Sequence, residues 1–240
     1  KKLEGMFAFA LWDKKKKSLY FARDRFGEKP LFYYLDSNFL VFSSELKTIK
    51  KFFNNSNLEI NNMSCSLFAS LGYIPAPLTI YKKTFKVLPS EIIEINNHKV
   101  ISKEKYWDVR KINESSLSLN QNKIDLLLEK SVKKMMVADV EVGCFLSGGI
   151  DSSLVASLMQ KNSIKKVKTF TIGFKEKQYD ESNNAKEIAN HLGTDHHELI
   201  VSMDDLIKNI DKVTEIYDEP FGDSSFLPTD IVCQLAKKHL

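Results

Sequence analysis

The sequence has little cysteine, and its cysteines form no recognisable set. Cys65, Cys144 and Cys233 are the only three among 240 residues, and no two of them have the spacing of a metal-binding motif. Neither a disulfide framework nor a zinc site is therefore supported. Long apolar runs are also absent, since no stretch approaches the ~20 residues that cross a membrane. We expect a cytoplasmic protein without a membrane partner.

A strong charge of one sign is missing as well. The formal net charge is only +4, with 35 basic and 31 acidic residues. The one conspicuous basic run, the four lysines at positions 14–17, is not accompanied by a basic face with interleaved aromatic residues. Nucleic-acid binding would need such a face. We therefore expect no nucleic-acid partner.

The first half of the chain contains short apolar segments separated by turn-forming residues. This pattern is typical of antiparallel strands. The predicted strands are residues 6–12, 18–22, 30–35, 39–43, 90–95 and 99–102, and short helices are predicted at 45–53 and 64–71. We interpret the first four strands as an antiparallel meander.

A polar segment then separates two different patterns. The predicted organisation is one domain over residues 1–110, a linker over 111–122 and a second domain over 123–240. In the second domain the predicted strands are 142–146, 167–174 and 196–201, and the predicted helices are 124–135, 154–160, 181–192, 203–213 and 225–238. Strands that alternate with helices indicate a parallel sheet covered on both faces.

Residues 145–153, with the sequence FLSGGIDSS, hold the most informative motif of the chain. A strand that runs through two glycines into a helix start directs backbone N–H groups, and the positive end of the helix dipole, at one point. Such a point can receive a phosphate chain, helped by hydroxyl donors and by glycines that allow close approach. These residues are Ser147, Ser152, Ser153, Gly148 and Gly149. Asp151 would repel a bare phosphate, so we expect a divalent cation to bridge it to the phosphate oxygens.

The motif differs from the Walker P-loop, because no lysine follows Gly149 at the required offset. Ser-Gly-Gly-x-Asp-Ser instead resembles the pyrophosphate loop of ATP pyrophosphatases, which release AMP and pyrophosphate. A plain Gly-Gly turn between a strand and a helix is the competing interpretation. The combination of strand, acid, three serines and helix favours the pyrophosphate loop.

Several motifs, in their order, resemble the glutamine-hydrolysing asparagine synthetase family. GMFAFALWD at 5–13, ARDRFG at 22–27 and FSSELK at 42–47 are similar to its glutaminase domain, and YIPAP at 73–77 resembles the run between its domains. FLSGGIDSS, HLGTDHHE at 191–198 and DEPFGDSS at 218–225 resemble its synthetase domain. The expected fold is α+β in the first part, an antiparallel portion of a glutaminase-type N-terminal hydrolase sandwich. A truncated, Rossmann-like α/β ATP-pyrophosphatase domain with a parallel sheet is expected to follow.

The resemblance implies an ATP-dependent carbon–nitrogen ligase with glutamine as amido donor. Such an enzyme hydrolyses L-glutamine to glutamate and ammonia, activates L-aspartate as a β-aspartyl-adenylate, and releases AMP, diphosphate and L-asparagine. ATP and Mg²⁺ are the implied cofactors, and a homodimer is the expected assembly of the full-length protein. The family's glutaminase cysteine precedes the segment seen here, and neither Cys65 nor Cys144 matches it. No catalytic residue is therefore assigned, and we expect this segment alone to be an inactive internal fragment.

The resemblance also assigns a nucleotide site. Its expected ATP-binding residues are Leu146, Ser147, Gly148, Gly149, Asp151, Ser152, Ser153 and Ile172. Asp151 is the expected magnesium ligand. Leu146 and Ile172 match positions that line the adenine, although each could equally be part of a strand core. Gly173 could serve only to end its strand.

Three acidic residues, Asp218, Glu219 and Asp223, are the candidates for the substrate site. They lie between two predicted helices, where the carboxyl edge of a parallel sheet usually binds ligands. They could contact aspartate, magnesium or ammonia. Alternatively, Asp223 or Ser224 could only cap the last helix.

Other residues and functions stay open. His196 and His197 are adjacent on a predicted strand and should face opposite ways, so we favour a structural role over a shared metal. Arg23, Asp24 and Arg25 could form a buried ion pair or a contact between domains, and we favour a structural role for them. Two alternative functions remain: a paralogue that amidates another carboxylate, such as a sugar acid or an antibiotic precursor, and a non-catalytic nucleotide-binding protein.

Overall fold

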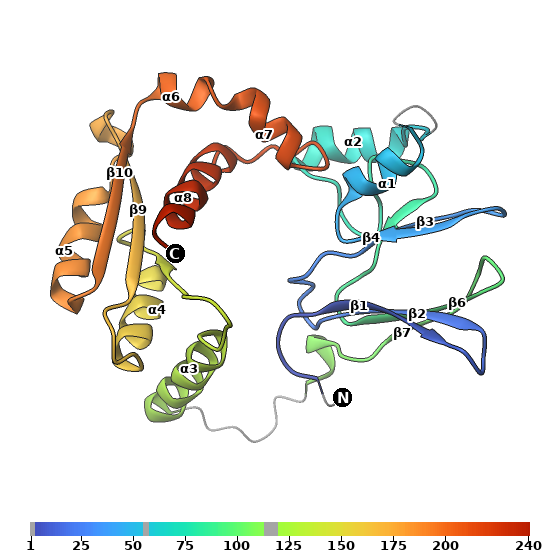
Figure 1. Cartoon of the computed structure of the whole chain (residues 1–240), viewed down its shortest axis with the longest axis horizontal. Helices are drawn as coiled ribbons and strands as arrows, with labels where there is room; N and C mark the ends of the chain where they lie inside the picture. The colour runs from blue at the N-terminus through green and yellow to red at the C-terminus, as the bar shows by residue number, and fades with distance from the viewer. Residues whose placement is uncertain (1–2, 55–57, 113–119) are drawn as a thin grey trace. The chain divides into compact units, whose positions relative to one another are not determined.

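The computed structural model of the protein describes residues 3–54, 58–112 and 120–240. The chain forms two units (Figure 1). Unit 1 comprises Lys1–Ser115 and Ile216–Asp223, and unit 2 comprises Ser116–Glu215 and Ser224–Leu240. Most of the linker predicted at 111–122 lies outside the described residues. Among the helices of the described part, none is both long and apolar enough to cross a membrane.

Unit 1 contains two antiparallel sheets, with strand orders β1-β2-β6-β7 and β4-β3-β5. The strands of the first sheet are β1 (Ala8–Asp13), β2 (Ser18–Arg23), β6 (Glu91–Asn96) and β7 (Lys99–Lys105). Those of the second are β3 (Phe32–Leu35), β4 (Leu40–Ser43) and β5 (Thr84–Lys86). The helical elements are α1 (Leu46–Phe52), α2 (Asn62–Leu71) and a short 3-10 turn at Val109–Lys111. The sequence predicts all of these strands except β5.

The predicted four-strand meander is wrong, because the chain changes sheets after β2. β2 pairs with β1 and β6, whereas β3 pairs with β4 and β5. The chain after β2 winds around the buried carboxylate of Asp24, which accepts hydrogen bonds from three backbone N–H groups. The donors are Phe26, Glu28 and Lys29, at 3.0–3.1 Å. This compact turn replaces a hairpin and leads the chain into the second sheet.

The two sheets of unit 1 enclose one apolar core. Phe21 and Ile93 from the first sheet and Tyr33 from the second are buried in it, and the rings of Phe21 and Tyr33 lie 5.6 Å apart. The second sheet also packs against α1, whose Leu46 and Ile49 are completely buried. Burial of each such side chain contributes about 1.5–3 kcal/mol. Unit 1 is therefore held together by layers of sheet and helix.

Unit 2 is built on a parallel sheet of order β10-β9-β8, and the prediction of a parallel sheet is confirmed. Its strands are β8 (Cys144–Phe145), β9 (Lys168–Phe174) and β10 (Asp195–Val201). The helices of this half of the chain are α3 (Gln121–Met135), α4 (Ile150–Lys161), α5 (Ser182–Leu192), α6 (Met203–Ile207), α7 (Ile210–Ile216) and α8 (Phe226–His239), with a 3-10 turn at Lys177–Tyr179. Antiparallel sheets followed by a parallel three-stranded sheet with helices give the chain an α+β arrangement.

Helices cover both faces of the parallel sheet. α4 and α5 contribute Ala156, Ala185 and Ala189 to a core with Leu146, since small side chains let helices approach closely. α8 packs through Leu235 and its neighbours against Phe170 of β9. In Figure 1, α5 and α8 lie on opposite sides of β9 and β10.

Several predicted boundaries differ from the structure, and those around the phosphate-loop motif and the capping box differ most. β8 is shorter than the strand predicted at 142–146, and α4 begins at Ile150, four residues earlier than predicted. The capping box of Ser202 and Asp205 is confirmed, but the helix that it opens is divided into α6 and α7. At the break, the Asn209 side-chain amide donates to the Asp205 carbonyl at 2.7 Å. This bond competes with a backbone hydrogen bond of a continuous helix.

Candidate functional site

A pocket of about 400 Å³ opens in unit 2 beside the FLSGGIDSS motif. Four residues that the sequence assigns to a nucleotide site line this pocket: Leu146, Ser147, Ser152 and Ile172. They come from the loop after β8, from the first turn of α4 and from β9. The other four predicted residues, Gly148, Gly149, Asp151 and Ser153, belong to the same loop and helix turn. The fold therefore brings separate predicted segments to one place.

The start of α4 leaves strong hydrogen-bond donors available. Gly149 occupies the N-cap position, and because glycine has no side chain it caps none of the helix N–H groups. The first N–H groups of a helix have no acceptor within the helix, so those of Ile150, Asp151 and Ser152 need another partner. These donors carry the positive end of the helix dipole and suit an anionic ligand.

Serine hydroxyls are held beside this helix start. Ser147 Oγ and Ser152 Oγ lie 3.0 Å apart, and Ser152 Oγ also accepts from the Ser147 N–H at 3.2 Å. Ser153 Oγ donates to the Gly149 carbonyl at 2.6 Å. A hydroxyl group can rotate its hydrogen toward a new acceptor. The first two hydroxyls can therefore turn toward a phosphate oxygen without movement of the backbone.

The two glycines of the loop meet different requirements. Gly148 has φ +83°, and a Cβ there would lie 2.9 Å from Asn184 Cβ and 3.0 Å from the Ala185 nitrogen. Gly149 has φ −78°, and a Cβ there would meet only Ser147 Oγ, at 3.4 Å. Gly148 is thus required by its backbone conformation and by the packing of the loop on α5. Packing does not require glycine at position 149, and close approach of phosphate, the reason that the sequence suggests, stays a prediction there.

The apolar wall of the pocket also belongs to the core of unit 2. Leu146 is only 1% exposed, its N–H donates to the Phe170 carbonyl at 2.9 Å, and its carbonyl accepts from the Thr171 hydroxyl. Ile172 packs with the cluster around Val201. Leu146 and Ile172 therefore line the pocket and stabilise the sheet at the same time.

The end of β9 is fixed next to the pocket by Asp180. Its Oδ1 accepts from the N–H groups of Ser182 at 3.1 Å and Phe174 at 3.3 Å. Hydrogen bonds from the Ser182 hydroxyl and N–H hold the pKa of Asp180 below its usual value. A Cβ at Gly173 would lie 2.4 Å from Ile200 Cδ1 and 2.9 Å from this carboxylate oxygen. Gly173 lies within β9, where this close packing accounts for the glycine.

Part of the pocket was not predicted from the sequence. Ser225, Pro228, Thr229 and Val232 line it from the start of α8, and Glu181 lines it from the segment before α5. The helix itself is predicted, but its place over β9 is not. The only available signal is the apolar spacing of Val232, Leu235 and Ala236, which marks the face that packs on Phe170.

The three candidate substrate residues are placed differently. Asp218 and Glu219 accept hydrogen bonds from backbone N–H groups of unit 1, those of Leu46 and Ile80. Glu219 also forms an ion pair with Lys86. Asp223 is exposed at the end of the same segment. The first two acids thus have structural partners that the sequence did not indicate.

The adjacent histidines contact opposite faces of the parallel sheet. His196 Nδ1 lies 2.9 Å from Thr169 Oγ1, and burial lowers the pKa of His196. His197 instead stacks on Phe170, with the ring centroids 5.4 Å apart. Within the described residues, no group of three or more histidine, cysteine or acidic side chains could hold a metal ion. Both histidines have structural contacts.

Asp24 and Arg23 are held by the backbone of unit 1 and not by each other. Besides the three N–H groups of its turn, Asp24 accepts from the Phe7 N–H at 3.2 Å. The Arg23 guanidinium donates to the carbonyls of Lys29, Val87 and Gly27. These contacts explain the ARDRFG motif through the stability of unit 1.

Similar proteins fall into one group. Residues 1–107 match the model of the glutamine amidotransferase domain, and residues 123–240 match the model of asparagine synthase. A Methanocaldococcus jannaschii protein named putative asparagine synthetase (glutamine-hydrolysing) 2 is 41% identical over 99% of this chain and 47% of its own length. Asparagine synthetase (glutamine-hydrolysing) 1 of Bacillus subtilis is 34% identical over 100% of this chain and 38% of its own length. The Homo sapiens asparagine synthetase (glutamine-hydrolysing) is 27% identical over 90% of this chain and 39% of its own length.

The two matches define a protein in which a glutamine amidotransferase part is followed by an asparagine synthase part. The chain belongs to the glutamine-hydrolysing asparagine synthetase family. It spans less than half the length of each of these three relatives.

Proposed function

We propose that the protein containing this chain is an ATP-dependent ligase that makes L-asparagine from L-aspartate with the amide nitrogen of L-glutamine. The observation that carries this proposal is the uncapped start of α4, flanked by serine hydroxyls at the mouth of a partly apolar pocket. Residues 1–110 form part of a glutaminase-type hydrolase sandwich, and residues 123–240 form part of a Rossmann-like ATP-pyrophosphatase domain. Family membership supports both assignments.

We place the base and the phosphates of ATP at different sides of this pocket. Leu146 and Ile172 offer an apolar surface to the base, while the loop from Ser147 to Ser153 offers N–H and hydroxyl donors to the phosphates. No lysine is needed in the loop, because the helix start supplies the positive potential. The pocket therefore suits a nucleotide whose phosphate chain ends against α4.

The residues present also fit Mg²⁺. Asp151 is exposed in the first turn of α4, next to the donors proposed for the phosphates. Magnesium is commonly held by one or two carboxylates together with substrate phosphates, so one acid is a sufficient protein ligand. When bound, the ion would neutralise charge on the phosphate oxygens.

The proposed reaction is dictated by the chemistry of the carboxylate. Aspartate's side-chain carboxylate is a poor electrophile, and attack of one of its oxygens on the α-phosphorus of ATP gives an acyl-adenylate and pyrophosphate. The loop N–H groups stabilise the charge that develops on the departing pyrophosphate, and one preorganised donor of this kind is worth about 2.7–4 kcal/mol. Ammonia from glutamine then attacks the acyl carbon, and AMP leaves. We place this enzyme in the cytoplasm as a homodimer, on the resemblance to the family alone.

An isotope experiment tests the proposal. The protein expressed from its complete reading frame is incubated with ATP, Mg²⁺, aspartate and glutamine labelled with ¹⁵N in the side-chain amide. We expect labelled asparagine, in an amount equal to the AMP formed. Label in another amide, when sugar acids are supplied with aspartate, would identify a paralogue with a different acceptor. Nucleotide binding without any amide product would identify a non-catalytic protein.

A further inference from the structure

The segment Ile216–Asp223 begins with the last residue of α7 and ends just before α8, yet it packs as part of unit 1. The asparagine synthase match, residues 123–240, includes this segment. The chain therefore leaves unit 2 after α7, joins unit 1 for eight residues and returns to unit 2 before α8. We call Ile216–Asp223 the clasp. Two acids and one glycine hold it in place.

Asp218 caps a helix that its own sequence leaves uncapped. Glu45 is at the N-cap position of α1 but makes no side-chain capping bond. The Asp218 carboxylate accepts from the Leu46 N–H at 2.5 Å and from the Lys47 N–H at 3.3 Å. A carboxylate at a helix N-terminus satisfies free N–H groups and interacts favourably with the helix dipole. The clasp thus completes a helix of unit 1.

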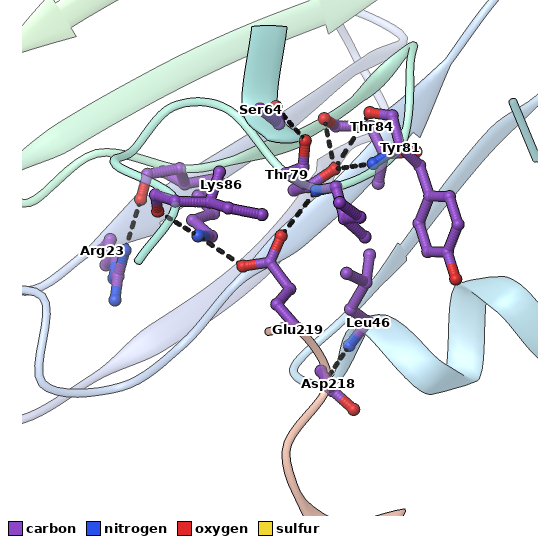
Figure 2. A network of polar contacts seen from close by, with 12 residues as sticks. Arg23, Leu46, Ser64, Thr79, Tyr81, Thr84, Lys86, Asp218 and Glu219 are labelled. Atoms are coloured by element: carbon purple, nitrogen blue, oxygen red, sulfur yellow. Dashed lines mark hydrogen bonds and ion pairs between the residues drawn. The ribbon is translucent and has the colours of Figure 1, made fainter. Parts of the chain in front are cut away.

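Glu219 is anchored through both carboxylate oxygens (Figure 2). Oε1 accepts from the Ile80 N–H at 2.7 Å, and Oε2 lies 2.5 Å from Lys86 Nζ. Lys86 Nζ also donates to the Ile74 carbonyl at 2.7 Å. The side chains of Lys86 and Glu219 are only 17% and 13% exposed. Loss of one partner would leave a buried charge unpaired, which is strongly unfavourable.

The backbone of the clasp touches unit 1 directly at two glycines. The Gly222 N–H donates to the Gly72 carbonyl at 2.7 Å. A Cβ at Gly222 would lie 3.1 Å from both Cα and O of Gly72. Gly72 itself ends α2 with φ +76°. The clasp is therefore fixed at its middle by two acids and near its end by close backbone contact.

The chain runs from the clasp directly into the wall of the nucleotide pocket. Ser225 and Pro228, which line the pocket, come only two and five residues after Asp223. Only a short stretch of chain therefore separates the anchored residues of the clasp from the start of α8. This short stretch of backbone connects the clasp to the pocket.

We propose that Asp218 and Glu219 are positioning residues: they fix the clasp on unit 1 and thereby hold the start of α8 in the form that binds ATP. This inference rests on the proposed function. It gives the two acids the role of keeping one wall of the ATP pocket in place. Linkage then requires a reciprocal effect, because a clasp that strengthens nucleotide binding is itself strengthened by the nucleotide. In this proposal neither acid binds aspartate.

The first test replaces Glu219→Gln in the protein expressed from its complete reading frame. The amide keeps an acceptor for the Ile80 N–H but loses the charge that pairs with Lys86. In aspartate-dependent ATP–pyrophosphate exchange, we expect the KM for ATP to rise by about fivefold or more, the lower range of allosteric coupling. The kcat at saturating ATP and the KM for aspartate should stay within about twofold of wild type, because the proposal gives Glu219 no contact with aspartate or with the reacting groups.

The matched control is Glu59→Gln. Glu59 also pairs with a lysine of unit 1, Lys82, at 2.9 Å, but the Lys82 and Glu59 side chains are 55% and 74% exposed. This variant should leave the KM for ATP unchanged. An unchanged KM for ATP in Glu219→Gln, or a rise confined to the KM for aspartate, would overturn the clasp proposal. Absence of ATP–pyrophosphate exchange in the wild type would instead defeat the proposed function.

A measurement on the wild type decides the matter if Glu219→Gln does not fold. Hydrogen–deuterium exchange of the peptides that contain Leu46 and Ile80 is followed with and without saturating α,β-methylene-ATP. We expect the nucleotide analogue to slow exchange at these amides by about fivefold or more, because both donate to the clasp. Protection limited to residues 145–153 and α8, with none in unit 1, would overturn the proposal.

Discussion

The buried acids of unit 1 and the proposed phosphate loop of unit 2 differ in how far their polar groups are hydrogen-bonded. In unit 1, Asp24, Asp218 and Glu219 have both carboxylate oxygens engaged by backbone N–H groups or by a lysine. In unit 2, the first N–H groups of α4 have no cap, and Asp151 is exposed beside them. Satisfied polar groups hold a fold together, whereas unsatisfied donors at a pocket can bind a ligand. An acid within a motif is therefore assigned to substrate only after its other partners are known.

Of the substitutions considered, Asp151→Asn should have the largest effect on ATP–pyrophosphate exchange. It is also the most direct test of the contrast between the two units. Loss of the carboxylate should lower ATP–pyrophosphate exchange by about 100-fold or more, the size of effect seen when one charge-stabilising group is removed. The thermal midpoint should change little, because the side chain is exposed. Ser157→Ala, a substitution at another position of the same helix, is the control and should retain exchange. Unchanged exchange in Asp151→Asn would remove this residue from the site.

Asp24→Asn should instead lower stability. The amide group would place N–H donors opposite backbone N–H groups that now donate to Asp24, which is only 1% exposed. Loss of hydrogen bonds to a buried charged group should cost about 2–4 kcal/mol. Chemical denaturation at pH 7 measures this loss. A variant as stable as the wild type would mean that the turn around Asp24 contributes little to unit 1.

The pH dependence of the stability difference between wild type and Asp24→Asn gives a more specific test. Burial raises the pKa of Asp24, but hydrogen bonds from the N–H groups of Lys29, Glu28, Phe7 and Phe26 outweigh it and leave the pKa below its usual value near 4. A carboxyl whose folded pKa is lowered contributes stability above its unfolded pKa and loses it as pH falls through the folded pKa. The stability difference between wild type and Asp24→Asn should therefore shrink below about pH 4. A difference that stays constant down to about pH 2.5, well below the unfolded pKa, would contradict this role.

The smallest effects are expected for alanine substitutions of the two loop glycines, which should differ in their loss of stability. Gly148→Ala should cost about 1–3 kcal/mol, because alanine is disfavoured at φ +83° and its Cβ would clash with Asn184. Gly149→Ala should cost about 1 kcal/mol or less, because replacing a good N-cap residue typically costs about 1 kcal/mol with alanine and a few tenths with glycine. Its KM for ATP should nevertheless rise, since a Cβ would be added at the proposed phosphate site. Equal stability losses in the two variants, measured by thermal unfolding, would refute this distinction.

Local patterns predicted much of the fold and of the phosphate loop. The alternating strands and helices of unit 2 are indicated by hydrophobic spacing, and residues 145–153 carry their own signal as glycines, hydroxyls and an acid between a strand and a helix. The capping box of Ser202 and Asp205 was found for the same reason. Each of these features depends on residues that are close in the sequence.

The remaining features depend on contacts between distant segments. Asp218 is 172 residues from its partner Leu46, and Glu219 is 139 residues from Ile80. No local pattern could indicate these partners. The separation of β2 and β3 into different sheets was also hidden, because it requires the buried Asp24 turn. The place of α8 over β9 similarly depends on tertiary packing alone.

The central claim is that the uncapped start of α4 holds the outer phosphates of ATP while the bond between the α- and β-phosphates is broken. Phosphorus NMR of the protein with ATP, Mg²⁺, aspartate and glutamine measures this directly. AMP and pyrophosphate, formed in equal amounts, are the predicted products. ADP with orthophosphate would contradict the claim.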